Sequence, residues 1–230
     1  MNATEIRATW SLASLFAFRM LGLFMVLPVF AVYGQELAGA TPALIGLAIG
    51  AYGFSQAVLQ VPFGFLSDRF GRKNVILAGL VLFALGSVQA AVATDIYGVI
   101  LGRILQGAGA IAGAVMALLS DLTREEQRTK SMAMVGASIG MSFSLALIAG
   151  PMIAAWFDLQ GVFWLTAMLA IVGMALTVWV VPNPRVQTVR DSRPVAAQFW
   201  IVLRQPELMR LNVGVFLLHM SMTAMFVVVP

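Results

Sequence analysis

The sequence contains no cysteine and a single histidine, His219. Without cysteine the chain forms no disulfide and offers no thiolate to a metal ion, and one histidine is too few for a transition-metal site built from protein side chains alone. No glycine-rich nucleotide-binding loop and no nucleophile with a neighbouring base is recognisable. We therefore expect no metal site, no cofactor and no catalytic residues.

Charged residues are also scarce, at 10% of the 230 residues, whereas 60% are apolar. A soluble domain has roughly 25% charged and about 45–50% apolar residues, and so few polar side chains cannot cover a water-exposed surface. The apolar residues form continuous runs long enough for helices that cross a bilayer, and they do not alternate as barrel strands do. We expect an all-α polytopic membrane protein with spans near residues 12–33, 44–66, 75–94, 96–119, 132–156 and 162–181.

The basic residues lie on one side of these spans. Twelve of the 14 Lys and Arg residues precede the first span, follow the sixth, or lie in the connections between spans 2 and 3 and between spans 4 and 5. The opposite connections contain only the acids Glu36, Asp95 and Asp158. Positive charge stays in the cytoplasm, so we place the N-terminus there and expect no nucleic-acid partner.

Residues 182–210 form the only long connection and contain four prolines. We expect a cytoplasmic linker with a short helix in the membrane interface. A seventh span begins near Leu211 and reaches Pro230. The expected organisation is a six-helix bundle over residues 1–181, this linker, and the start of a second bundle over residues 211–230, which makes the chain a fragment of a longer protein.

The stretch GFLSDRFGRKNVIL between spans 2 and 3 concentrates charge in a short turn. Asp68 can cap a helix N-terminus, and Gly71 supplies backbone freedom. One interpretation is a generic basic turn that binds lipid phosphates. The order of its residues instead resembles the signature that follows the second helix in the major facilitator superfamily; the residues concerned are Gly64, Leu66, Ser67, Asp68, Arg69, Gly71, Arg72 and Lys73.

Three further motifs are similar to those of the twelve-helix drug:proton antiporter branch of that superfamily. Span 1 contains LGLFMVLPV, with Ala31 where a second proline is usual, and span 4 contains LGRILQGAGA. Span 5 contains AGPMIAA, in which alanine replaces several of the motif's glycines. The residues that carry these similarities are Leu21, Gly22, Pro28, Val29, Arg103, Gln106, Gly107, Gly109, Gly150 and Pro151.

The resemblance implies a transporter of the bacterial cytoplasmic membrane. In that family two six-helix bundles, each built from inverted three-helix repeats, rock about a central site. The charged turn would act as a conformational latch, with Asp68 capping a helix of the second bundle. The implied partners are a small amphiphilic substrate, protons, the lipid bilayer and the missing C-terminal bundle.

Several polar residues lie inside the spans and are candidates for the central cavity or for coupling. Arg19 and Arg103 are costly to bury and need a partner or water, and Gln106 lies one turn after Arg103. Their alternative role is a hydrogen-bond clamp between helices. The other candidates are a polar stripe in span 2, formed by Tyr52, Gln56 and Gln60, which can also serve helix packing, and the titratable His219.

Glycine and proline residues predict two further features. Gly46, Gly50 and Gly53 share one helical face, which favours close helix packing over gating. In span 5 the pair Gly150–Pro151 should kink the helix, because proline removes a backbone hydrogen bond.

No Asp or Glu lies within any span, although membrane carboxylates usually carry the protons of coupled transport. Coupling would therefore need a carboxylate in the missing half, His219, or a loop acid such as Asp68 or Asp121. We expect proton-driven efflux, with a facilitator on the same fold as the first alternative. A non-transporting scaffold or sensor and a membrane enzyme are the other classes.

Overall fold

The computed structural model describes residues 1–183 and 204–228 of the chain. The chain falls into two units, residues 1–187 and 188–230, and each is described by itself. Residues 184–203, which include nearly all of the predicted interfacial helix, lie outside the described residues.

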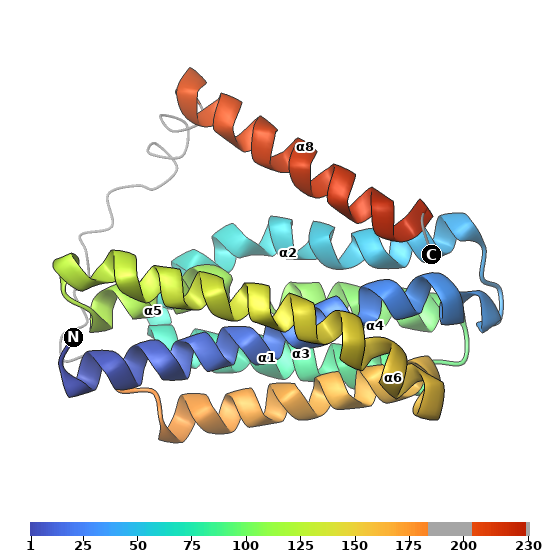
Figure 1. The fold of residues 1–230 in the computed structure, drawn as a ribbon, viewed down its shortest axis with the longest axis horizontal. Helices are drawn as coiled ribbons and strands as arrows, with labels where there is room; N and C mark the ends of the chain where they lie inside the picture. The colour runs from blue at the N-terminus through green and yellow to red at the C-terminus, as the bar shows by residue number, and fades with distance from the viewer. Residues whose placement is uncertain (184–203, 229–230) are drawn as a thin grey trace. The chain divides into compact units, whose positions relative to one another are not determined.

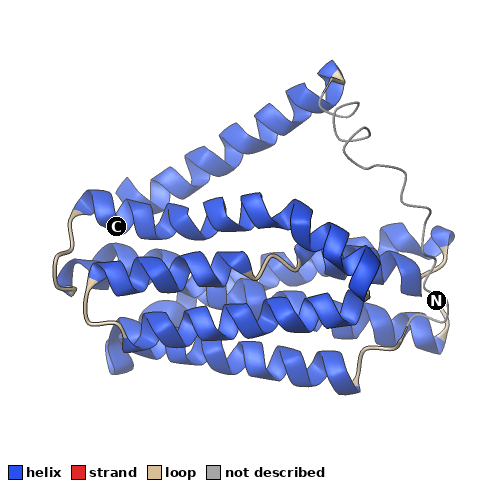
Figure 2. Ribbon diagram, turned by 180° about the vertical axis from the view of Figure 1, so that it is seen from behind, coloured by secondary structure: helices blue, strands red, loops and turns tan. Residues whose placement is uncertain are grey.

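The first unit is a bundle of long helices (Figure 1). Figure 2 shows only helices and loops in the described part of the chain. The helices are α1 (Ala3–Tyr33), α2 (Pro42–Phe70), α3 (Arg72–Val92), α4 (Ile96–Ala108), α5 (Ala112–Leu122) and α6 (Glu125–Trp179), with a 3-10 turn, η1, over Gly34–Glu36. The second unit contains α8 (Pro206–Val228).

Local sequence explains where these helices begin. Asn2 caps α1 by accepting a hydrogen bond from the backbone of Glu5, whose carboxylate accepts one from the backbone of Asn2 in return. Thr41 and Asp95 cap α2 and α4 through their side-chain oxygens. Between α2 and α3, Gly71 has a φ of 92°, a conformation that favours glycine.

The last two predicted spans of the bundle lie within α6. This helix has 55 residues, so at 1.5 Å per residue it is about 80 Å long, enough to cross the hydrocarbon core twice. Its backbone is non-helical at Asp158, where φ is 55° and ψ is −168°. The chain reverses direction there, and the half of α6 after Asp158 runs back along the bundle, antiparallel to the half before it (Figure 1).

The predicted fourth span, 96–119, is not one helix. It consists of α4 and α5, and the helical hydrogen bonding is interrupted between Ala108 and Ala112. Figure 2 draws this interruption as a short loop in the middle of the bundle.

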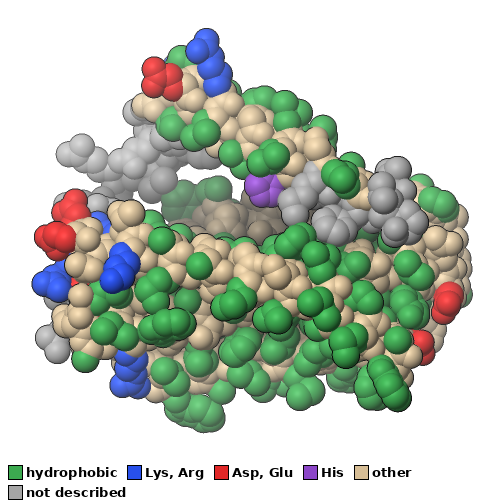
Figure 3. Space-filling model, in the orientation of Figure 1, with side chains coloured by type: hydrophobic (Ala, Val, Ile, Leu, Met, Phe, Trp, Pro, Cys, Tyr) green, Lys and Arg blue, Asp and Glu red, His purple; other side chains and the backbone are tan. Residues whose placement is uncertain are grey.

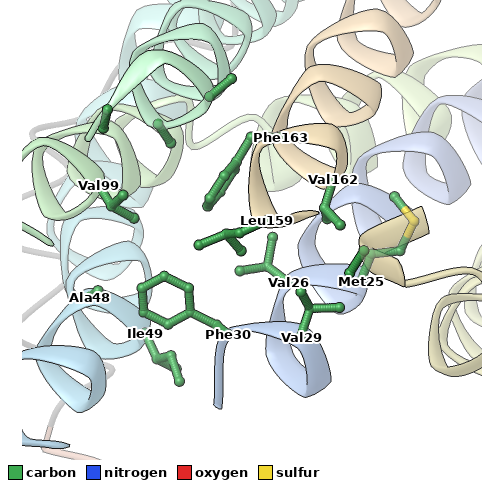
Figure 4. Packing of buried hydrophobic residues seen from close by; sticks show 14 of the residues in the cluster. Met25, Val26, Val29, Phe30, Ala48, Ile49, Val99, Leu159, Val162 and Phe163 are labelled. Carbon is green, nitrogen blue, oxygen red and sulfur yellow. The ribbon is translucent and has the colours of Figure 1, made fainter. Parts of the chain in front are cut away.

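Apolar side chains fill the bundle and also coat it. One buried cluster lies where α1, α2, α4 and the middle of α6 meet; it includes Phe30, Val99 and Phe163 (Figure 4). A second cluster lies nearer the basic end and includes Leu12, Ile76 and Leu118. On the face shown in Figure 3, apolar side chains cover the length of the bundle, and its Lys and Arg side chains gather at one end. The apolar coat and the basic end match a bundle solvated by lipid.

The positive φ of Asp158 predicts that glycine is more stable at this position. A non-glycine residue in this region of φ and ψ costs about 1–3 kcal/mol, and part of that gain is lost because glycine makes the unfolded chain more flexible. We expect Asp158→Gly to raise the free energy of unfolding by about 1 kcal/mol, measured by thermal unfolding of the purified chain in detergent.

Asp95→Gly is the control, because Asp95 has an extended φ of −128° and caps α4; losing this cap should lower stability by about a few tenths of a kcal/mol. Equal effects of both changes would contradict the strain at Asp158.

Candidate functional site

A layer of polar side chains separates the two apolar clusters of the bundle. Arg19 of α1 is 2% exposed and Arg103 of α4 is 1% exposed. Each guanidinium lies over an aromatic ring, Arg19 at 5.6 Å from the Phe83 centroid and Arg103 at 4.7 Å from the Tyr52 centroid. Of the candidates named from sequence, six therefore fall in or beside one layer: Arg19, Tyr52, Gln56, Gln60, Arg103 and Gln106.

Arg103 is bound into a chain of hydrogen bonds across three helices. Its Nη1 donates to Gln106 Oε1 at 2.9 Å, and Gln106 Nε2 donates to Ser87 Oγ of α3 at 2.8 Å. Ser87 in turn donates to the Phe83 carbonyl at 2.7 Å. On the other side, Arg103 Nε donates to the Ala48 carbonyl of α2 at 3.4 Å. An amide oxygen and a peptide carbonyl thus solvate this cation, and the Ser87 hydroxyl holds the amide in place.

Arg19 is less completely solvated. Its Nη2 donates to Gln56 Oε1 at 3.0 Å and to the Gly109 carbonyl at 2.9 Å. Its Nε and Nη1 are buried and have no hydrogen-bond partner in the described residues. The Tyr52 hydroxyl and Gln60 Oε1 are likewise buried without a hydrogen-bond partner in the described residues. Buried donors and acceptors without partners are costly, so this part of the layer is an incomplete polar site.

The Gly109 carbonyl can accept from Arg19 because the regular helical hydrogen bonding of span 4 is interrupted there. Two short-range backbone hydrogen bonds replace the helical ones, from Ala110 to the Ala108 carbonyl at 2.8 Å and from Ile111 to the Gly109 carbonyl at 2.9 Å. The regular bonding resumes with Val115. Arg19 therefore binds the chain at the point where α4 ends and α5 has not yet begun.

Glycines allow the backbones of α3 and span 4 to touch. A Cβ on Gly86 would lie 2.5 Å from the Gln106 backbone nitrogen, and one on Gly109 would lie 2.3 Å from the Gly79 carbonyl oxygen. Gly107 is equally close to α2, with the Tyr52 carbonyl oxygen 2.2 Å from its ideal Cβ. By contrast, Gly46, Gly50 and Gly53 have open space around them. The first group packs the bundle, and the second lies on a face of α2 that the bundle leaves bare.

The charged turn between α2 and α3 is bonded to the end of α5. Arg72 Nε lies 3.2 Å from Asp121 Oδ2, and Arg72 Nη1 donates to Ser67 Oγ at 2.7 Å. Arg72 also forms an ion pair with Asp68, whose side chain stays 62% exposed. Arg72 thus fixes the turn to its own bundle, and the Asp68 carboxylate remains accessible.

Two basic residues bind the last carbonyls of α6, where the chain leaves the bundle. Lys73 Nζ donates to the Val181 carbonyl at 2.9 Å. Arg7 of α1 donates to the carbonyls of Val180 at 2.9 Å and of Trp179 at 3.3 Å. Cations are favourable at a helix C-terminus, where the dipole is negative. Of the other residues of the turn, Arg69 lies over the neighbouring Phe70 ring, and the Gly64 carbonyl accepts from Ser67.

A further ion pair joins the start of α1 to the start of α6. Arg124 Nε lies 2.8 Å from Glu5 Oε1, and the Arg124 backbone N–H donates to the same oxygen at 3.1 Å. The hydrogen bond and charge of the Glu5 carboxylate raise the pKa of Arg124 above its ordinary value. The basic end of the bundle is therefore tied together at three places.

The remaining sequence candidates lie outside the polar layer. Gly150 packs α6 against α1, where an added Cβ would lie 2.8 Å from the Met25 carbonyl oxygen. The non-helical residue of α6 is Asp158, and Pro151 does not interrupt the helix. In the second unit, His219 Nδ1 lies 2.9 Å from the Val215 carbonyl of its own helix, α8.

Sequence reasoning missed several residues that the structure places in these contacts, namely Glu5, Arg7, Phe83 and Ser87. It also missed that Asp121 is the ion-pair partner of Arg72. The Asn2-x-x-Glu5 spacing is a capping-box signal that could have drawn attention to Glu5. For Ser87 and Phe83 there is no such signal, because their roles depend on which face of α3 meets α4.

A six-span bundle with buried arginines, bare glycine faces and a charged turn after its second span defines a polytopic membrane protein of the type expected from the motifs. Residues 12–230 match the Major Facilitator Superfamily. The chain belongs to this superfamily.

Relatives of the chain are known in several bacteria. It is 54% identical to the inner membrane transport protein YajR of Escherichia coli K12 over 231 residues, which are 100% of this chain and 51% of the relative. It is 40% identical to an uncharacterized transporter of Buchnera aphidicola, over 100% of this chain and 60% of that protein. It is 27% identical to the quinolone resistance protein NorA of Staphylococcus aureus, over 83% of this chain and 50% of that protein. The chain thus spans about half the length of these relatives.

Solved structures show the same fold. The human organic anion transporter MFSD10 matches 82% of this chain with 51% of its own, at a TM-score of 0.66 and 18% identity. The proton:xylose symporter XylE matches 79% of this chain with 46% of its own, at a TM-score of 0.66 and 15% identity.

The glycine contacts predict opposite outcomes for two glycine-to-alanine changes. Gly86→Ala places a Cβ 2.6 Å from the Gly102 carbonyl oxygen, besides the contact with Gln106; overpacking of this kind costs about 1–3 kcal/mol. Gly50→Ala meets no atom within 4 Å and gains up to about 1 kcal/mol of helix propensity. We expect the apparent melting temperature of the purified chain in detergent to fall for Gly86→Ala and to hold or rise for Gly50→Ala. Unchanged stability of Gly86→Ala would show that the α3–α4 contact is looser than described, and an equal fall in Gly50→Ala would show that its face of α2 is not bare.

Proposed function

We propose that the chain forms the N-terminal bundle of a secondary transporter in the bacterial inner membrane, which exports small amphiphilic compounds by alternating access in exchange for protons. The observation that carries this proposal is the match over the whole chain to the E. coli inner membrane transport protein YajR. The family match over residues 12–230 supports the same conclusion. In this proposal residues 211–230 begin the second bundle.

The polar layer supports a central site in such a protein. Polar and ionisable residues inside a membrane bundle are expensive and mark substrate or ion pathways. Here Arg103, Gln106 and the α2 stripe combine hydrogen-bonding groups with the aromatic rings of Tyr52 and Phe83. This combination suits an amphiphilic compound, which needs apolar contact as well as a few polar partners. The quinolone resistance protein among the relatives supports export of such compounds.

Coupling to protons requires a group that binds and releases a proton during transport. None of the ten acidic residues lies within a span, so in this proposal the proton is carried by a carboxylate of the second bundle, by His219, or by Asp68 or Asp121. A facilitator on the same fold would need no such group, and this scarcity favours it as the second candidate.

Efflux under an imposed pH gradient tests the proposal. In inverted membrane vesicles that contain the protein from its complete reading frame, we expect an acidic lumen to drive uptake of an uncharged fluorescent amphiphile. Collapse of the gradient should stop this uptake. We expect Arg103→Ala to reduce the initial rate more than tenfold, because it removes the cation that joins α2 to the Gln106–Ser87 chain. Arg19→Ala should have a smaller effect on this uncharged compound. Uptake indifferent to the gradient would favour the facilitator, and the reverse order of the two variants would contradict the assignment of Arg103.

The exposed carboxylate of Asp68 supports the latch role proposed for residues 64–73. Alternating access requires an arrangement of the two bundles that closes the cytoplasmic side, and a charge at a helix N-terminus across the interface contributes typically about 0.3–1 kcal/mol. Asp68→Asn keeps the size of the side chain and removes this charge. We expect transport to fall severalfold while the amount of inserted protein is unchanged, measured by uptake and by immunoblot of the same vesicles. Asp95→Asn makes the same chemical change in a loop on the opposite side and should transport normally. Normal transport by Asp68→Asn would refute the latch.

A further inference from the structure

The Arg19 guanidinium is a buried cation with no counter-charge in the described residues. The ion pairs of the described residues involve Arg72 and Arg124, which lie at the basic end of the bundle. The acids of the sequence all lie in loops or at span ends, so none can reach the middle of α1 from within its own bundle. A cation without its counter-charge in an apolar interior attracts an anion more strongly than one in water.

The hydrogen bonding of Arg19 shows which of its atoms are free. Nη2 is engaged by Gln56 and by the Gly109 carbonyl, whereas Nε and Nη1 have no acceptor. A neutral amide and a peptide carbonyl solvate one edge of the group and leave its charge uncompensated. An anionic oxygen that binds Nη1 therefore requires no existing hydrogen bond to break, and a charge-assisted bond of this kind is roughly twice as strong as a neutral one.

The surroundings of Arg19 add polar groups that also lack partners. Gln56, which binds Arg19, lies one helical turn from Tyr52 and one turn from Gln60 on α2. The Tyr52 hydroxyl can donate to an anionic oxygen, and Gln60 Oε1 can accept from an N–H or O–H group. Gln56 and Gln60 are partly exposed, whereas Arg19 is buried, so Gln56 is a partly exposed contact of the buried guanidinium.

Arg103 also has no counter-charge in the described residues, but its hydrogen bonding differs from that of Arg19. Its guanidinium donates to Gln106 and to the Ala48 carbonyl, and none of its nitrogens is among the buried described atoms that lack a partner. The two buried arginines thus differ: Arg103 is built into the contact between α2, α3 and α4, and Arg19 retains unused donors.

From these observations we infer that Arg19 binds a carboxylate group of the transported compound, with the Tyr52 hydroxyl as a second donor. The substrates then include amphiphilic monocarboxylates, whose apolar part lies against Phe83 and the neighbouring apolar side chains. The inference rests on the proposed transport function, because it is this function that brings such a compound to the site. The same carboxylate chemistry could come from an acidic side chain elsewhere in the complete protein, and the experiment separates the two sources.

Binding of benzoate tests the inference without any measurement of transport. The protein from the complete reading frame is purified in detergent, and its apparent melting temperature is measured against benzoate concentration at constant ionic strength. Benzamide, which has the same shape and no charge, is the ligand control.

We expect a saturable rise of the melting temperature with benzoate, little change with benzamide, and at least a tenfold weaker apparent affinity for benzoate in Arg19→Met. Arg19→Lys keeps the charge and should retain part of the benzoate effect even if the methionine variant folds poorly. Arg7→Gln, which removes a cation at the basic end of the bundle, should keep the benzoate response.

Three outcomes of the binding experiment would overturn the inference. A benzoate effect that survives in Arg19→Met places the anion elsewhere. No benzoate effect, with Arg19→Met less stable than the unsubstituted protein, means that an acidic side chain of the protein already pairs with Arg19. No benzoate effect with unchanged stability means that water alone satisfies the free nitrogens. Specific benzoate binding together with transport indifferent to the pH gradient would retain the carboxylate site and reject only the proton-coupled function.

Discussion

The interior of a membrane offers no water to a polar group, and the described bundle is organised around the few such groups that it contains. Arg19 and Arg103 lie between two apolar clusters, where an unsolvated guanidinium would be prohibitively costly. Peptide carbonyls, glutamine amides and aromatic faces take the place of water around them. The two side chains consequently connect helices that are distant in the sequence: Arg103 joins α4 to α2, and Arg19 joins α1 to α2 and to the unwound part of span 4.

Close approach of the backbones is what brings these acceptors within reach. The network of Arg103 depends on α3 lying directly against α4, and this contact exists only because Gly86 and Gly102 carry no side chain. Similarly, the Gly109 carbonyl faces Arg19 because the chain there has left the helical path. Small residues and polar solvation are therefore parts of one arrangement in this bundle, since larger side chains would push Ser87 and Gln106 apart.

Much of the fold could be predicted from the sequence, because the bilayer imposes simple requirements on it. Continuous apolar runs have to be helices, and the basic residues have to lie at one end, so the fold class followed directly. The motifs indicated the superfamily, to which the chain belongs. Gly71 could be placed in a turn because it stands between two apolar runs among charged residues, and in the structure it has the positive φ that such a turn needs.

The details of the polar layer could not be predicted, for physical reasons. The break in span 4 falls in the sequence Ala108-Gly109-Ala110-Ile111, which is as apolar as the helices on either side; it coincides with a carbonyl that accepts from Arg19, a residue ninety positions earlier. The positive φ of Asp158, in the predicted connection between the two spans of α6, has no sequence signal either, because glycine is the residue usual in that conformation. The partners of Arg103 and Arg72 depend on which helical faces meet, and one sequence does not contain this information.

The binding of Arg7 and Lys73 to the last carbonyls of α6 has a mechanical consequence. Lys73 belongs to the charged turn between α2 and α3, and Arg7 belongs to α1, so the point where the chain leaves the bundle is anchored to two other helices. Residues 179–181 can therefore shift relative to the charged turn that carries Asp68 and Arg72 only if the bond from Lys73 breaks or the turn moves with them.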